Sequence, residues 1–266
     1  MAGFSPTTQL FLSDVHLRAG SFSNRPDPEP SLLALIDFCE TKQIRITVLG
    51  DLFDYWIEYP GWSPPFGERV LGRFEEYHNC MGPSLYITGN HDHRTMGRLQ
   101  DAGFDVEKEY RYMTHDGYRF FIHHGDGLQD PAMGLKRSGL NRFLSSETVM
   151  RTYRRLLPPG AGLRFMKGFS SLCRIRPTDG PERLDVWSEK YLGNSSADFI
   201  ISGHDHIPRV RSMAGGIYAN PGAFYKDKTV ALYTNERISI VVWDYRENRL
   251  LPLTPSMEIA GKKMAR

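Results

Sequence analysis

The sequence has few cysteines, no long apolar segment and almost no net charge. Its three cysteines, Cys39, Cys80 and Cys173, are scattered without a CxxC pair, which argues against a disulfide framework and favours free thiols in a reducing compartment. No run of roughly eighteen apolar residues exists, so no membrane-spanning helix is expected. The first residues, MAGFSPTTQLFLSDVH, lack the basic flank and cleavable apolar segment of an export signal. We therefore expect a cytoplasmic protein.

The net charge is only +2, but the charges are unevenly distributed. Between Met133 and Arg176 the sequence has a single acid, Glu147. The basic residues of this segment are Lys136, Arg137, Arg142, Arg151, Arg154, Arg155, Arg164, Lys167, Arg174 and Arg176. Such asymmetry indicates an anionic partner for the segment, unless the basic side chains only form a solvated face.

Short β-rich runs recur along the chain, and each ends in polar residues. They cover residues 9–16, 45–51, 84–90, 119–126, 198–206 and 216–222. Apolar runs followed by Gly, Asp, Asn or His are typical of buried strands that enter loops. Helical patterns cover 30–43 and 67–80, and residues 229–235 and 237–245 should form a hairpin. This alternation predicts an α/β chain of 266 residues with one large domain, or one domain with an insertion.

Residues 131–182 differ from the rest, and we interpret them as a basic, amphipathic helical lid inserted into a core formed by residues 1–130 and 183–266. Apolar residues recur there at helical spacing on both sides of a Pro-Pro-Gly break at 158–160. The basic residues alternate with aliphatic rather than aromatic ones, unlike a base-stacking surface. We therefore do not expect a nuclease or another nucleic-acid-binding protein.

The ends of the expected strands carry potential metal ligands. In chain order these are Asp14, His16, Asp51, Asn90, His124, His204 and His206. Imidazole, carboxylate and amide oxygens together suit Mn, Fe, Zn or Co. A carboxylate that stands alone, such as Asp51, can bridge two cations, and two metals about 3.5 to 4 Å apart can activate a hydroxide and clamp a phosphoryl group. Each motif alone is weak, but their order behind five strands favours phosphoester hydrolysis.

In this order SDVH, LGD, GNHD, HGD and GHDH resemble the five motifs of the calcineurin-like metallophosphoesterases, from residue 9 to about residue 223, where NPGA resembles their closing turn. The resemblance implies a two-sheet β-sandwich flanked by helices in four layers, α/β/β/α, with a dinuclear site at the carboxyl edge of the sheets. One metal would be held by Asp14, His16, Asp51 and His206. The other would be held by Asp51, Asn90, His124 and His204, and manganese is the usual metal.

The segment GNHDH at residues 89–93 also implies catalytic roles. By the same resemblance, His91 would contact the phosphate or protonate the leaving oxygen, a role that an imidazole pKa near neutrality suits. Asp92 would accept a hydrogen bond from His91 and fix its orientation. We expect His93 to be an exposed loop residue, and His123 to point away from His124 because side chains alternate along a strand.

A narrower resemblance concerns residues 49–60, LGDLFDYWIEYP. They are similar to the LGDLFxxWIGDD segment of the UDP-2,3-diacylglucosamine diphosphatases, which cut a pyrophosphate and release UMP and carry a helical lid that covers acyl chains. The resemblance implies hydrolysis of UDP-2,3-diacylglucosamine to UMP and lipid X in lipid A biosynthesis. A basic amphipathic lid suits a lipid-linked substrate and peripheral contact with the inner face of the membrane. The chain departs from this branch at GNHD, where the branch has GNRD, and at EYP.

The lid supplies candidate substrate contacts. Arg154, Arg155, Arg164 and Lys167 could neutralise substrate phosphates. Acyl chains could be lined by Leu140, Phe143, Leu144, Val149, Met150, Leu156, Leu157, Phe165, Met166 and Phe169. The alternative is that these apolar residues only pack the helices of the lid together. Trp56 and Trp62, just beyond Asp51, either line the substrate cleft or pack in the core.

Two other functions stay open. The first is a phosphodiesterase acting on soluble nucleotides, or a phosphoprotein phosphatase, with the same metals. The second is a non-catalytic scaffold of the same fold, against which the full ligand set and His91 argue. No obligate protein partner is evident from the sequence.

Overall fold

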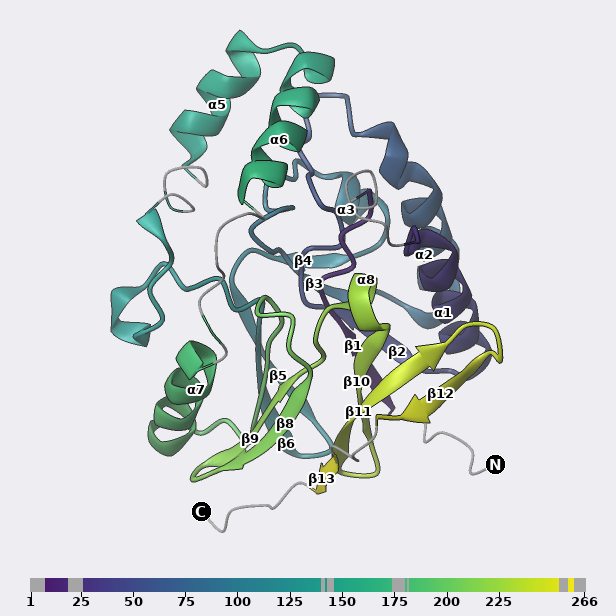
Figure 1. The fold of residues 1–266 in the computed structure, drawn as a ribbon, viewed down its shortest axis with the longest axis vertical. Coiled ribbons are helices and arrows are strands. Elements are labelled where there is room, and N and C mark those ends of the chain that lie inside the picture. The colour runs from purple at the N-terminus through teal and green to yellow at the C-terminus, as the bar shows by residue number, and fades with distance from the viewer. Residues whose placement is uncertain are drawn as a thin grey trace.

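The fold is a sandwich of two β-sheets with helices on its outer faces (Figure 1). The computed structural model describes residues 8–18, 26–139, 142, 146–173, 180, 182–253 and 258–260. The four-layer α/β/β/α arrangement expected from the sequence is confirmed. Among the described residues, no helix is long and apolar enough to cross a membrane.

The first sheet has eight strands in the order β12-β11-β10-β1-β2-β3-β4, with β13 paired to β11. Its strands are β1 (Gln9–Leu12), β2 (Arg45–Val48), β3 (Leu85–Ile87), β4 (Asp105–Glu107), β10 (Thr229–Thr234), β11 (Arg237–Asp244), β12 (Arg249–Pro252) and β13 (Glu258–Ala260). Strands β1 to β4 run parallel, so the loops that follow β1, β2 and β3 meet at one edge. The hairpin expected from the sequence is β10 and β11.

The second sheet has five strands in the order β5-β6-β7-β9-β8. They are β5 (Tyr110–His115), β6 (Tyr118–His123), β7 (Phe199–Ile201), β8 (Arg209–Met213) and β9 (Gly216–Asn220). The inner strands β6, β7 and β9 are parallel, so the loops after β6 and β7 also share an edge. The six strands expected from the sequence are confirmed, whereas β4, β5, β8, β12 and β13 were not expected.

Apolar side chains on alternate positions build the layers. Leu10 and Leu12 of β1 face the helices α1 and α2, whereas Phe11 faces the second sheet. Phe120 and Phe199, on neighbouring strands of the second sheet, stack with ring centroids 4.6 Å apart in the core that the two sheets share. Because the first sheet is covered on both faces, every residue of β1 and every residue of β2 except Arg45 is buried.

The helices cover the outer faces and one end of the sandwich (Figure 1). They are α1 (Glu29–Thr41), α2 (Glu68–Met81), α3 (Arg98–Asp101), α5 (Glu147–Leu156), α6 (Pro159–Cys173), α7 (Glu182–Asn194) and α8 (Phe224–Asp227), with short 3-10 turns η2 (Pro65–Gly67) and η3 (Pro131–Met133). The helices α1 and α2 confirm the two helical patterns of the sequence. Helix α7 packs on the second sheet through Leu184 and Trp187.

The segment interpreted as a lid contains α5 and α6, which form one end of the molecule (Figure 1) and are called the lid below. Met150 and Met166 of the lid are buried against Tyr55, Ile57 and Tyr59, which follow β2. The lid therefore docks on the segment next to Asp51. Two candidate lining residues, Leu156 and Phe165, are exposed. Leu140, Phe143 and Leu144, and the side chain of Phe169, lie outside the described part of the chain, and the boundaries 131–182 remain a prediction.

Candidate metal centre

Every loop that carries a candidate ligand follows a buried strand, and the backbone there is strained. Five of the seven candidates, none of them glycine, have positive φ angles: Asp14 (52°), His16 (47°), Asp51 (53°), His204 (74°) and His206 (63°). Residues other than glycine rarely adopt this conformation, and such strain clusters at functional sites. Strand β1 ends at Leu12, so the next residues can turn their side chains to the same side.

Glycines allow the ligand loops to approach one another closely. A Cβ on Gly89 would lie 2.1 Å from Oδ1 of Asp51, and a Cβ on Gly203 would lie 1.8 Å from Oγ of Ser13. Any other residue at either position would push the loops apart. The two glycines of the GN and GH motifs are therefore needed for the packing of the site.

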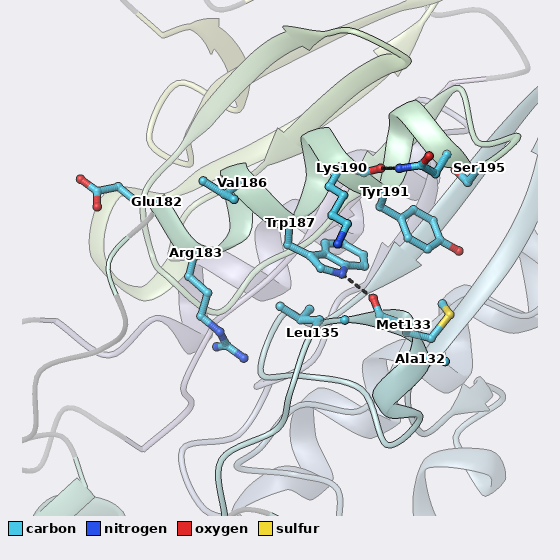
Figure 2. Close-up of a pocket in the computed structure, with 12 residues that line it drawn as sticks. Ala132, Met133, Leu135, Glu182, Arg183, Val186, Trp187, Lys190, Tyr191 and Ser195 are labelled. Carbon is cyan, nitrogen blue, oxygen red and sulfur yellow. Dashed lines mark hydrogen bonds between the residues drawn. The ribbon is translucent and has the colours of Figure 1, made fainter.

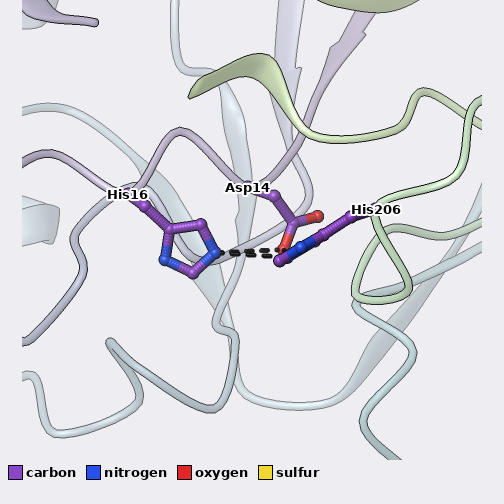
Figure 3. A group of neighbouring side chains, drawn as sticks. All are labelled: Asp14, His16 and His206. Carbon is purple, nitrogen blue, oxygen red and sulfur yellow. Dashed lines mark hydrogen bonds and ion pairs between the residues drawn. The ribbon is translucent and has the colours of Figure 1, made fainter. Parts of the chain in front are cut away.

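Three ligand atoms converge at the end of β1 (Figure 3). Oδ1 of Asp14 lies 3.1 Å from Nε2 of His206 and 3.5 Å from Nε2 of His16, and the two imidazole nitrogens lie 3.3 Å apart. The other carboxylate oxygen of Asp14 accepts hydrogen bonds from Oγ of Ser13 (2.5 Å) and from the backbone N–H of His204 (2.9 Å). This leaves Oδ1 directed at the imidazoles.

A second group of ligand atoms surrounds Asp51. Its Oδ2 lies 3.4 Å from Nε2 of His124 and 3.9 Å from Nε2 of His16, so one oxygen faces both groups. Nε2 of His124 also lies 3.2 Å from Oδ1 of Asn90. The ring of His204 stands beside that of His124, with centroids 5.2 Å apart. Nδ1 of His124 lies 2.7 Å from the carbonyl oxygen of Leu49, which orients Nε2 toward the site.

The charges in the site suit a divalent cation. Burial raises the pKa values of Asp14 and Asp51, but the neighbouring histidines outweigh it and hold both pKa values below their usual range. Burial lowers the pKa of His204 to about 3, which keeps its ring neutral. Burial lowers the pKa of His16 as well, but its bonds to Asp14 and Asp54 raise it to about 10. Ionised carboxylates with imidazole and amide donors fit divalent transition metals, which displace protons when they bind.

His91 stands at the side of this cluster. Its Nδ1 lies 2.7 Å from the carbonyl oxygen of Asp54, and its Nε2 lies 4.0 Å from Oδ2 of Asp51. When Nδ1 carries the proton and donates to that carbonyl, Nε2 faces the ligands. The ring of His91 meets that of His16 edge to face at 5.0 Å.

The prediction that Asp92 orients His91 is wrong. Oδ1 of Asp92 accepts from the backbone N–H of Gly89 (2.7 Å), and Oδ2 accepts from the N–H of Leu52 (2.8 Å) and the hydroxyl of Tyr86 (2.6 Å). The buried carboxylate thus joins the loops after β2 and β3. The carbonyl of Asp54 takes the orienting role, and a backbone acceptor leaves no signal in the sequence.

Two other histidines were expected to lie outside the chemistry. His93 is half-buried rather than exposed, with Nδ1 3.1 Å from the carbonyl oxygen of Asn90. His123 is fully buried on the opposite side of β6 from His124, with its ring 5.0 Å from that of Trp187. Burial lowers the pKa of His123 to about 3, so it is a neutral core residue.

A buried network that the sequence did not reveal supports the GHDH loop. The carboxylate of Asp205 is bound by Nη1 (3.0 Å) and Nη2 (2.6 Å) of Arg209, and by Nδ2 of Asn220 (2.9 Å). Nε of Arg209 reaches Asp185 of α7 at 2.8 Å. This network fixes the residue between His204 and His206, and it explains why NPG follows the last ligand motif.

The candidate substrate cations of the lid differ in their surroundings. Nε of Arg154 donates to the carbonyl oxygen of Glu58 (2.7 Å), and Nη2 donates to that of Arg94 (3.2 Å). Arg154 therefore ties α5 to the core. Arg155 and Arg164 are exposed, and Lys167 is half-buried.

The two tryptophans next to Asp51 also differ. Trp56 is fully buried, stacks on Phe53 with ring centroids 4.1 Å apart, and donates from Nε1 to Oε1 of Glu58 at 2.8 Å. It is a core residue and does not line a cleft. Trp62 is half-buried and meets Tyr59 edge to face at 5.9 Å.

A hollow of about 670 Å³ lies between η3 and α7, on the outer side of the second sheet (Figure 2). Trp187 lies in its wall and donates from Nε1 to the carbonyl oxygen of Met133 at 2.7 Å. None of the candidate ligands lines the hollow. It is separate from the metal centre.

Known proteins are similar to this chain over most of its length. The UDP-2,3-diacylglucosamine hydrolase of Proteus mirabilis is 23% identical over 254 residues, which cover 89% of this chain and 99% of that protein. The hydrolase of the same name from Photobacterium profundum is 24% identical over 250 residues, or 90% and 98%. The solved structure of Yfce, a phosphoesterase from E. coli, superposes with a TM-score of 0.49 at 14% identity and covers 96% of this chain and 100% of that one.

A sequence model of the calcineurin-like phosphoesterases matches residues 7–208. This span contains every loop described above, from Asp14 to His206. The Asp and His cluster that metal-dependent phosphoester hydrolysis requires is intact. The chain therefore belongs to the calcineurin-like phosphoesterases, a family of metal-dependent enzymes.

Proposed function

We propose that this enzyme hydrolyses the pyrophosphate of UDP-2,3-diacylglucosamine to UMP and lipid X, a step of lipid A biosynthesis. The observation that carries this proposal is the docking of a basic helical lid on Tyr55, Ile57 and Tyr59, directly beside the loop of Asp51. Such a lid places apolar and cationic side chains next to the metal centre, as a phosphorylated lipid requires. The distant relatives named for this reaction, matched over nine-tenths of the chain, support it.

We infer the following ligand set from the resemblance to the family, and the convergence of Asp and His side chains after the strands supports it. One cation would be held by Asp14, His16, Asp51 and His206, and the other by Asp51, Asn90, His124 and His204; Oδ2 of Asp51 faces His16 of the first group and His124 of the second. Manganese is the proposed metal. When bound, the two cations act as Lewis acids and lower the pKa of water at the site.

The residues of the chain then supply orientation and a proton. One pyrophosphate P–O bond breaks, the oxygen of a water molecule bonds to that phosphorus, and two phosphate monoesters are released. Nε2 of His91 faces the ligands because Nδ1 is engaged by the carbonyl of Asp54, so Nε2 can accept a proton at the site, and the imidazolium that forms can donate it to the leaving oxygen. The water supplies that proton.

The proposed location is the cytoplasm, with peripheral contact at the inner face of the membrane. The lid carries the basic excess of the chain, and Leu156 and Phe165 are exposed on it, 73% and 59% respectively. Cationic and apolar side chains on one exposed element suit an anionic bilayer surface.

Substrate choice is tested with purified, manganese-loaded protein. UDP-2,3-diacylglucosamine in mixed micelles is compared with a soluble nucleotide diester and an aryl phosphate, and release of UMP is measured. We expect the lipid substrate to be cut far faster than the other two. Equal or faster hydrolysis of the soluble diester would instead support the nucleotide phosphodiesterase.

The roles of two site residues are tested together. His91→Ala is expected to lower turnover about 100- to 10,000-fold while the bound metal is kept, because only the proton donor is lost. Asp51→Ala should lose both metals and turnover, because one carboxylate faces both ligand groups. Metal content and turnover are measured on the same samples. Loss of metal from His91→Ala would show that His91 is a ligand.

A further inference from the structure

Arg94 is a buried cation that lacks an anionic partner. Its side chain follows the GNHDH motif and is 5% exposed. Nε is fully enclosed without a hydrogen-bond partner, and within the described part of the chain no carboxylate lies within 4 Å of the guanidinium. Burial of an unpaired charge is costly, and arginine cannot escape the cost by losing its proton. An anionic ligand that pairs with the guanidinium would offset this cost.

Arg94 lies at the junction of the lid with the loops that follow β2 and β3. Its carbonyl oxygen accepts from the N–H of Glu58 (3.0 Å) and from Nη2 of Arg154 (3.2 Å), so its backbone is fixed. Burial lowers the pKa of Arg94 to about 10, and this is opposed by Tyr153 of the lid and by Asp92 and Asp51 of the core. The guanidinium therefore interacts electrostatically with both sides of this junction.

The groups around Arg94 are also short of negative charge. Among the described residues, Arg154 has no carboxylate within 4 Å, and its donors bind backbone carbonyls. The buried hydroxyl of Tyr59 has no hydrogen-bond partner. The carboxylate of Glu58 is already used, because it accepts from Trp56, Thr95, Met96 and Arg98. Arg154 donates to the carbonyl oxygen of Arg94, so two cations that have no carboxylate within 4 Å among the described residues meet under the lid, an arrangement suited to an anion with several oxygens.

We propose that Arg94 binds the second phosphoryl group of a pyrophosphate substrate, the one that is not attacked at the metals. This inference rests on the proposed function, because it assumes a substrate with two adjacent phosphoryl groups. A simple phosphate ester places its only phosphoryl group at the metal ligands and leaves Arg94 unpaired. Arg94 is therefore the residue that selects pyrophosphate esters over esters of a single phosphate.

The stability of the free protein separates this role from a structural one. In Arg94→Met the aliphatic stem is kept and the unpaired charge is removed, so the melting temperature should stay the same or rise. Arg98→Met is the matched control, because Arg98 is paired with Glu68 and Glu75 at 2.8 Å, and its melting temperature should fall slightly. A clear fall for Arg94→Met, larger than that of the control, would overturn the proposal.

Activity gives the second measurement. For manganese-loaded Arg94→Met we expect kcat/KM on UDP-2,3-diacylglucosamine to fall about 100-fold, because a buried charge pair with the substrate is lost. Hydrolysis of bis(p-nitrophenyl) phosphate, which has one phosphoryl group, should stay within about threefold. Arg98→Met should change neither. Equal losses on both substrates would assign Arg94 to the metal centre and overturn the proposal.

Failure of the proposed function can be recognised separately. If wild-type protein does not cut the lipid substrate, the role of Arg94 is tested by inhibition. UMP and methylene-bridged UDP are compared as inhibitors of bis(p-nitrophenyl) phosphate hydrolysis. We expect the diphosphate analogue to inhibit wild type at least tenfold more strongly than UMP, and Arg94→Met to lose this preference. A preference that is absent from wild type, or unchanged in the variant, would overturn the role of Arg94.

Discussion

Two arginines are equally buried in this enzyme and have opposite surroundings. Arg209, behind the GHDH loop, is 6% exposed, and Arg94, under the lid, is 5% exposed. Arg209 binds the carboxylates of Asp205 and Asp185 and lies over the ring of Tyr218 at 5.0 Å. Burial lowers the pKa of both arginines, but the hydrogen bonds that Arg209 donates to Asp205 outweigh it and raise the pKa of Arg209.

This difference distinguishes an arginine with a structural role from one that is proposed to bind a ligand. The charge of Arg209 is balanced within the chain, so it holds the loop between His204 and His206 in place. Among the described residues, no carboxylate lies within 4 Å of the Arg94 guanidinium. Burial alone therefore does not assign the role of a charged residue, and its partners do.

The largest effect is expected at Arg209. Arg209→Met leaves the buried carboxylate of Asp205 without its cation, so the free energy of unfolding should fall by about 3 to 5 kcal/mol. Urea unfolding at pH 7.5 measures the change. Adding Asp205→Asn removes the orphaned charge and should recover part of the loss. A decrease in the free energy of unfolding below about 1 kcal/mol would show that Arg209 does not have the structural role that distinguishes it from Arg94.

A smaller, local effect is expected at Arg154. Arg154→Met removes two charge-assisted hydrogen bonds to the carbonyls of Glu58 and Arg94, which together contribute about 2 kcal/mol. Amide hydrogen exchange should rise in α5 but not in α1. Arg155→Met, at the exposed neighbouring position, is the control. Unchanged exchange in α5 would show that the apolar contacts of Met150 and Met166 alone keep the lid docked on the core.

The smallest effect is expected at His78, a buried side chain that, unlike arginine, can lose its proton. His78 is buried, with Nδ1 2.6 Å from the carbonyl oxygen of Ala102, and burial lowers its pKa below the usual 6.5. As the pH falls below about 6.5, His78 takes up a proton in the unfolded chain but not in the folded chain. The free energy of unfolding therefore decreases as the pH falls through this range. His78→Asn keeps a donor for Ala102 and should be spared this loss.

The measurement is the difference in unfolding free energy between His78→Asn and wild type at pH 8 and pH 5. The difference should move in favour of the variant at pH 5, by less than about 1 kcal/mol. A difference that does not change with pH would show that His78 titrates alike in both states. That outcome would remove the contrast between histidine, which escapes burial by losing its proton, and arginine, which cannot.

The sequence predicts those parts of the fold whose residues are buried. Nearly every residue of strands β1, β2, β6 and β7 is buried because both faces are covered, and the polar residues after these strands mark the ligand loops. The unexpected strands are short or half-exposed. Tyr110–His115 alternates between half-buried and exposed positions, and β4 has only three residues. Such segments have little apolar pattern to reveal them.

The candidate ligands can also be predicted from the sequence, but the groups that orient them cannot. The seven candidate ligands follow strands, so their convergence could be expected from topology. The carbonyl of Asp54 behind His91 is a backbone group, and nothing in the sequence distinguishes it. Arg94 and Arg154 look alike in sequence, and only the docking of the lid shows that one binds carbonyls while the other is left without an anion.

The candidate ligands divide between the two sheets. Asp14, His16, Asp51 and Asn90 follow strands of the first sheet, whereas His124, His204 and His206 follow strands of the second. An ion held by both groups is therefore also a cross-link between the two halves of the sandwich. Its binding energy adds to the cohesion of the sheets, because binding to the native state alone stabilises that state. A chelator should accordingly loosen the seam between the sheets as well as stop turnover.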